Sequence, residues 1–150
     1  MNISTPNGQL YAYIGGKEFD AAKPTVVFIH GVLNDHSVWI LQSRYLAHHG
    51  WNVLAIDLPG HGKSGGEPPA TVEAASATIV ALLDALGVAQ AALVGHSFGS
   101  LIALETAARA PARSGYACPT RPPPCAPSNA NLLPASSAAR AKAARSARNP

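Results

Sequence analysis

Ser97 carries the clearest chemical signal in the sequence, because it lies between small residues in the segment Gly95-His96-Ser97-Phe98-Gly99. This segment follows the apolar run 91–94 and opens an alanine-rich stretch, which predicts a strand, a sharp turn and a helix. Such a turn strains the serine backbone, and Gly95 and Gly99 leave room where a Cβ would collide with neighbouring chain. The free N–H groups at the helix start favour an oxyanion. The pattern therefore predicts a serine nucleophile that attacks a carbonyl group.

Two further polar motifs follow runs that are typical of buried strands. His30 and Gly31 come after the β-branched run 25–29, and Asp57 comes after the apolar run 52–56. In a parallel sheet, ligands bind at the carboxyl ends of the strands. The three motifs are therefore expected to meet at one edge of a sheet.

Helices are predicted between these strands, so that strand and helix alternate. Helical spacing of Val38, Leu41, Tyr45 and Leu46 predicts a helix over 37–49, and Thr71 is positioned to cap a second helix that ends near Gly87. The alternating segment 9–14 indicates an edge strand or half of a hairpin. Strands alternating with helices predict an α/β fold with a mostly parallel sheet.

The three motifs, in this order and spacing, resemble those of the α/β-hydrolase fold, in its esterase, lipase and peptidase-like branch. The resemblance covers residues 24–112 and rests on 28–32, on 57–64 (Asp-Leu-Pro-Gly-His-Gly-Lys-Ser) and on 95–99. It implies a sheet with helices on both faces and a nucleophile elbow at Ser97. It also implies an oxyanion hole formed by the backbone N–H groups of Phe98 and Val32.

The resemblance also assigns supporting roles and a class of substrate. His30 and Gly31 are expected to support the oxyanion loop, and Gly95 and Gly99 the turn around Ser97. A serine nucleophile implies attack on an ester, amide or related carbonyl bond of a small molecule. It argues against the members with an aspartate nucleophile, the epoxide hydrolases and haloalkane dehalogenases.

The remaining histidines are not expected to act in catalysis. His61 precedes Ser97 and belongs to the segment 57–64, which we expect to shape a loop. His96 occupies the variable position of the serine motif. His48 and His49 fall at a helix C-terminus, where they suit the helix dipole and require no metal. We therefore expect neither a metal nor a cofactor.

The partners that the serine needs are missing downstream. No histidine follows Ser97, and Glu105, two helical turns further on, is the last acidic residue. In this fold the acid and the histidine follow the serine. A serine without a base is a weak nucleophile, so we expect little hydrolase activity from the chain as written. The alternative is a binding module without catalysis, a pseudoenzyme with a basic tail.

Composition changes abruptly near Arg113. Residues 1–112 suit a partial α/β-hydrolase domain, whereas 113–150 are rich in Pro, Ala and Arg and contain no acidic residue. We expect this second region to be disordered, because it has too little apolar surface to offset the entropy of ordering. A truncated or frame-shifted hydrolase would explain the change, and so would a short protein with a genuine tail. Either way, the strand before Ser97 would have an open outer edge.

The composition excludes several other classes. Hydrophobic residues make up 47% of the chain and charged residues 13%. All eight acidic residues fall before residue 106, so the body of the chain is mildly acidic. An acidic body does not suit binding to nucleic acid. The N-terminus lacks the basic and apolar regions of a secretory signal, and no apolar run is long enough to span a membrane. We expect a cytoplasmic protein in which Cys118 and Cys125 form no structural disulfide.

Overall fold

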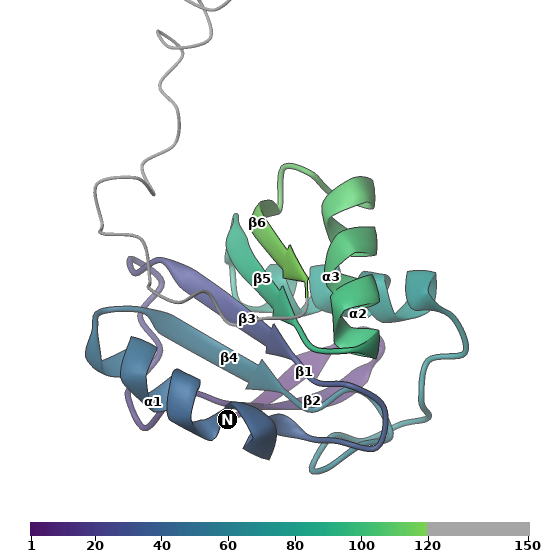
Figure 1. Ribbon diagram of the computed structural model, residues 1–150, viewed down its shortest axis with the longest axis horizontal. Coiled ribbons are helices and arrows are strands. Elements are labelled where there is room, and N and C mark those ends of the chain that lie inside the picture. Colours follow the sequence, from purple (N-terminus) through teal and green to yellow (C-terminus); the bar gives the residue numbers. More distant parts are fainter. Residues whose placement is uncertain (120–150) are drawn as a thin grey trace, which may run out of the picture.

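Strand β3 (Thr25–Ile29) is the central strand of a six-stranded sheet in the computed structural model, which describes residues 1–119 (Figure 1). It pairs in parallel with β4 (Asn52–Ile56) on one side and with β5 (Ala91–Gly95) on the other. The other strands are β1 (Asn2–Thr5), β2 (Gly8–Tyr13) and β6 (Ser114–Pro119), and the spatial order is β1-β2-β4-β3-β5-β6. β2 runs antiparallel to both β1 and β4, so the sheet is mixed with a parallel centre.

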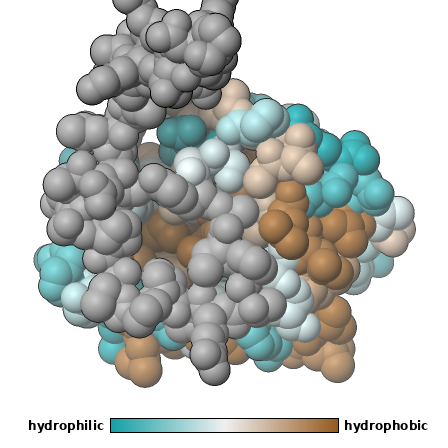
Figure 2. Space-filling model, turned by 45° about the horizontal axis from the view of Figure 1, so that its top comes forward, coloured by the Kyte–Doolittle hydropathy of each residue, from teal (hydrophilic) through white to brown (hydrophobic). Residues whose placement is uncertain are grey.

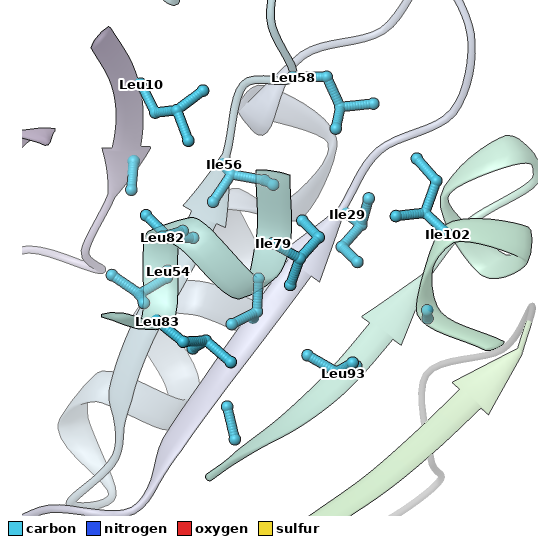
Figure 3. Close-up of a cluster of buried hydrophobic side chains, with 14 of the residues drawn as sticks. Leu10, Ile29, Leu54, Ile56, Leu58, Ile79, Leu82, Leu83, Leu93 and Ile102 are labelled. Atoms are coloured by element: carbon cyan, nitrogen blue, oxygen red, sulfur yellow. The ribbon is translucent and has the colours of Figure 1, made fainter. Parts of the chain in front are cut away.

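Both faces of the sheet are covered, and this explains the continuous apolar composition of its central strand. Val27 and Ile29 belong to the larger core, which includes residues of α2 (Val72–Ala85) and α3 (Phe98–Arg109) (Figure 3). Val26 and Phe28 belong to the second core, on the face covered by the 3-10 helix η1 (His36–Trp39) and by α1 (Ile40–His48). Successive residues of a strand point to opposite faces, so a strand buried on both faces needs apolar side chains throughout. The α/β fold class is confirmed.

Helix α1 is confirmed, but most of the apolar residues that predict it lie at the surface. Leu41 is 79% exposed, Tyr45 is exposed, and so is Val38 in η1, whereas Leu46 packs partly buried against the second core. The buried residues are the small ones, Ser43 and Ala47. A Cβ on Gly15 would lie 2.5 Å from the Ala47 Cβ, so the chain passes too close to this helix face for large side chains.

Helix α2 begins and ends where the sequence predicts. Thr71 has an extended backbone, and its hydroxyl accepts a hydrogen bond from the Ala74 N–H at 3.2 Å, as an N-cap does. The chain leaves the helix through Gly87, whose φ of 65° lies in the left-handed region. Ile79, Leu82 and Leu83 fill the larger core (Figure 3).

Strand β6 corrects the expectation that disorder begins at residue 113 and leaves β5 with an open edge. β6 pairs in parallel with β5 along its whole length, with a register irregularity near Ala91. The strand is anchored at its start, where the Arg113 carbonyl accepts from the Ala91 N–H at 3.0 Å. The Arg113 guanidinium donates to the Val88 carbonyl at 2.9 Å and pairs with Asp84 at 2.7 Å. The rest of the predicted tail, 120–150, lies outside the described residues.

Apolar side chains also lie on the surface, in patches rather than evenly among the hydrophilic ones (Figure 2). The large exposed ones are Val32, Leu33, Val38, Leu41, Tyr45, Leu101 and Leu104. None of the helices within residues 1–119 has the length and apolar character needed to cross a bilayer.

Candidate active site

Ser97 lies in a strained turn between β5 and α3. Its φ of 54° and ψ of −120° fall in a region of backbone conformation that residues other than glycine rarely adopt. The serine immediately precedes the first residue of α3, Phe98. Among the described residues, hydrogen bonds occupy the N–H groups of Gly99 and Ser100 but not that of Phe98. The hydroxyl therefore stands beside a free N–H at a helix N-terminus, where negative charge is stabilised.

Two glycines make this turn possible. A Cβ on Gly95 would lie 2.1 Å from the Gly99 carbonyl oxygen, and a Cβ on Gly99 would lie 2.3 Å from the carbonyl oxygen of Ile29 on β3. Both obstacles are backbone atoms, which cannot rotate away. The close approach of α3 to the end of β3 thus requires glycine at both positions.

The loop after β3 brings a second backbone segment to Ser97. A Cβ on Gly31 would lie only 3.1 Å from the Ser97 Cβ, so these two residues are in contact across the turn. Val32 follows and is 59% exposed. In the described part of the chain its N–H has no hydrogen-bond acceptor. The structure therefore places Gly31 against Ser97, with Val32 and Phe98 as their neighbours in the chain. The oxyanion hole that the sequence predicts at Val32 and Phe98 stays a prediction.

His30 is a buried link between the loops that follow β3 and β4. Its Nδ1 lies 2.7 Å from the Gly31 carbonyl oxygen, and its Nε2 accepts from the Leu58 N–H at 3.0 Å. This pair of contacts requires the neutral ring with its proton on Nδ1. Burial, partly offset by the hydrogen bond to the Gly31 carbonyl, lowers the pKa of His30 below its ordinary value. Both ring nitrogens are used, so His30 braces the loop and leaves no free nitrogen for Ser97.

The loop after β4 is organised around the buried carboxylate of Asp57. One carboxylate oxygen accepts from the His36 backbone N–H at 2.7 Å and lies 2.9 Å from His36 Nδ1, and the other accepts from the Lys63 N–H at 2.8 Å. The Ser64 hydroxyl donates to the Asp57 carbonyl at 2.6 Å and accepts from the Tyr11 N–H, which ties the loop to β2. This loop has the shaping role that the sequence predicts.

His36 is the residue that the sequence analysis missed. Its ring lies 5.0 Å from that of Tyr11, centroid to centroid, beside Asp57. Together with Asp35, the pair could offer metal ligands within 4.8 Å of one another, but hydrogen bonds already occupy both Asp57 oxygens. Nothing in the spacing of His36 and Asp57 in the sequence predicts this contact.

The hydrogen bonds described for the histidine side chains are made to partners other than Ser97. His36 contacts Asp57, His49 contacts the Tyr45 carbonyl at 2.6 Å, and His61 contacts the Pro59 carbonyl at 3.0 Å. Glu105 is paired with Arg109 on the same helix. Within residues 1–119, no histidine is hydrogen-bonded to the Ser97 hydroxyl.

Comparison with known proteins assigns the chain to a family. Residues 24–115, more than half of the chain, match the family described as the alpha/beta hydrolase fold. The chain belongs to the α/β hydrolase fold family. The resemblance stated from the sequence is thereby confirmed.

Several curated hydrolases and transferases are similar to this α/β hydrolase. Lipase LipV from Mycobacterium tuberculosis is 40% identical over 88 residues, which cover 57% of this chain and 32% of the lipase. The dihydrolipoyllysine-residue acetyltransferase component of an acetoin cleaving system from Pseudomonas putida is 39% identical over 89 residues, 59% of this chain and 24% of that protein.

Solved structures of the same fold also match. The enol-lactonase from Burkholderia xenovorans gives a TM-score of 0.68 at 29% identity, over 76% of this chain and 44% of that one. An epoxide hydrolase from Vigna radiata gives a TM-score of 0.69 at 26% identity, over 77% of this chain and 36% of the epoxide hydrolase. The chain therefore spans less than half the length of each of these four proteins.

Proposed function

We propose that this chain carries the nucleophile and the oxyanion hole of a serine hydrolase that acts on an ester, amide or related carbonyl bond of a small molecule. The observation that supports this most is the backbone of Ser97, whose strained conformation serves no packing purpose that a glycine could not serve better. A hydroxyl in that position can attack a carbonyl carbon. An epoxide hydrolase is among the similar structures, but residue 97 is a serine and not an aspartate.

The backbone N–H groups of Val32 and Phe98 are proposed to bind the oxyanion. Attack by the Ser97 oxygen on the carbonyl carbon would release the hydroxyl proton to solvent and move an electron pair onto the carbonyl oxygen, which would then accept from these two donors. Rigid donors of this kind each contribute roughly 2.7–4 kcal/mol to transition-state stabilisation. His30 and Gly31 would hold one donor in place, and Gly95 and Gly99 the other.

We also propose that the chain as written turns over substrate slowly. Within the described residues no histidine is hydrogen-bonded to Ser97, and the residues of a triad act as a unit. Residual cleavage of p-nitrophenyl butyrate should therefore change little in Ser97→Ala. Rapid turnover that disappears in Ser97→Ala would contradict this and would indicate that His30 or His61 leaves the hydrogen bonds described above and acts as the base.

Methylboronic acid tests the nucleophile without requiring turnover. The Ser97 oxygen adds to boron and releases one proton to solvent, which converts trigonal boron to a tetrahedral anion. ¹¹B NMR distinguishes the two forms. We expect a saturable tetrahedral signal with the parent chain and with Ser4→Ala, which alters an exposed serine on β1, but none with Ser97→Ala. Binding that persists in Ser97→Ala would instead favour a binding module without catalysis.

A further inference from the structure

Leu33, like Ser97, has a backbone conformation that is usual only for glycine. These two are the only non-glycine residues within 1–119 with a positive φ, 60° at Leu33 and 54° at Ser97. Both lie in turns that follow parallel strands of the sheet, and both turns open at the same edge (Figure 1). The Gly31 contact joins the two turns directly.

The turn that contains Leu33 is held firmly in this conformation. The Gly31 carbonyl accepts from the Asn34 N–H at 3.3 Å, which closes a four-residue turn, and lies 2.7 Å from His30 Nδ1. The Asn34 side chain also donates to the Val32 carbonyl at 3.4 Å. A turn with a positive φ at its third residue favours glycine or asparagine there.

Folding alone does not account for a leucine at this position. Its side chain is 92% exposed, so it contributes almost no burial to the core. Its backbone conformation is unfavourable for any residue with a large side chain. Glycine or asparagine would adopt the same turn more easily, and neither would place an apolar group in water. Strained residues that persist in this way cluster at functional sites.

We propose that Leu33 is a specificity-determining residue that receives the aliphatic acyl chain of the substrate. This inference rests on the proposed function of Ser97. Leu33 directly follows Val32, whose N–H is the proposed oxyanion donor, so an acyl chain attached to the bound carbonyl would lie beside this turn. Val32 and Leu33 together offer it an exposed apolar surface. The substrate class is therefore an ester, amide or thioester with a straight apolar acyl group of several carbons.

Alkylboronic acids of increasing length test this proposal, because the alkyl group takes the place of the acyl chain. We compare methylboronic and hexylboronic acid by ¹¹B NMR titration of the parent chain, Leu33→Gly and Leu33→Asn. Both replacements accept a positive φ, so the donor N–H of Val32 stays in position. Leu41→Asn is the matched control, because Leu41 is also an exposed leucine but lies on α1.

We expect hexylboronic acid to bind the parent and Leu41→Asn about tenfold more tightly than methylboronic acid, since each buried methylene adds to affinity. In both Leu33 variants this preference should fall to about twofold or less, while the affinity for methylboronic acid stays within about twofold of the parent. Both variants should also unfold at a temperature equal to or above that of the parent, because the left-handed strain is relieved.

The possible failures are distinguishable. An unchanged preference for hexylboronic acid in the Leu33 variants would overturn this inference and leave the role of Ser97 standing. Loss of methylboronic acid binding or a lower unfolding temperature in both variants would also overturn it, because Leu33 would then hold the turn together. A parent chain that forms no tetrahedral adduct would overturn the proposed function, and this inference with it.

Discussion

The turn at Ser97 and the loop at Asp57 lie at the same edge of the sheet but use their polar groups in opposite ways. Asp57 is completely buried, and each of its carboxylate oxygens has a hydrogen-bond donor within residues 1–119. The Ser97 hydroxyl is bound to none of the described histidines, and its backbone is strained. The loop satisfies its buried carboxylate, whereas the turn keeps a backbone conformation that is unfavourable for a serine.

This difference shows that an acid and a histidine in contact do not by themselves indicate a catalytic site. Asp57 and His36 are an acid and a base in contact with one another. The hydrogen bonds of Asp57, however, hold the loop in its shape. Ser97 has no such partner among the described histidines, yet it keeps a backbone conformation that glycine would adopt more easily. Polar groups without a partner and a strained backbone are therefore better grounds for a candidate site than the types of residue that meet there.

The largest expected effect comes from crowding the Ser97 turn. In Gly99→Ala the new Cβ would lie 2.3 Å from the Ile29 carbonyl oxygen and 2.6 Å from that of His30. Because neither backbone atom can move alone, we expect a loss of about 4 kcal/mol in the free energy of unfolding, or no folding at all. Urea denaturation measures it. Gly65→Ala is the control, since its Cβ would lie 3.8 Å from the nearest atom, and equal stability of the two variants would contradict the tight approach.

Removing the carboxylate from the Asp57 loop should have the next largest effect. Asp57→Ala leaves the N–H groups of His36 and Lys63 without their acceptor, and we expect a loss of roughly 3 kcal/mol in unfolding free energy. The exposed Asp20, which pairs with Lys23, provides the control Asp20→Ala and should cost far less. A small loss in Asp57→Ala would mean that the loop is not held by its carboxylate.

Relieving the strain at Ser97 should stabilise the protein. Ser97→Gly removes the Cβ that makes a φ of 54° costly, so we expect a gain of about 1 kcal/mol in unfolding free energy together with loss of the boronate adduct. Ser97→Ala keeps the Cβ and should show no gain. Equal stability of the two variants would indicate that the turn is not strained.

The smallest expected effect is a dependence of stability on pH through His30, which connects the two regions. Burial lowers its folded pKa below the ordinary value of 6.5, so the unfolded chain binds the extra proton more readily. Its contribution to stability is complete above pH 6.5 and declines as the pH falls from there toward the folded pKa. His30→Gln should reduce this slope of the thermal midpoint against pH, whereas His48→Gln should preserve it. An unchanged slope in His30→Gln would assign the dependence to another group.

Local sequence patterns predicted three strands of the sheet and the turn that contains Ser97. The runs 25–29, 52–56 and 91–94 are continuous and β-branched or apolar, and all three form buried strands. The glycines around Ser97 predicted the sharp turn because only a missing Cβ permits it. The turn at Ser97 therefore followed from sequence, since the glycines that permit it lie within two residues of the serine.

Features that depend on distant contacts could not be predicted in the same way. Strand β6 contains no β-branched residue and ends at Pro119, yet pairing with β5 makes it a strand. The small residues Ser43 and Ala47 form the buried face of α1, because the close passage of Gly15 selects small side chains there, and no local pattern indicates this. The contact of His36 with Asp57 joins residues from two separate loops, and no local pattern encodes it.

The central place of β3 has a consequence for how the protein is made. Thr25 at its start pairs with Asn52 on one side and Ala91 on the other, so both partners of the strand come later in the chain. During synthesis β3 leaves the ribosome long before β5 does, and its five residues, all buried in the folded protein, remain without one neighbour for that time. A chaperone that binds extended apolar segments would find a target in β3 until β5 has also left the ribosome.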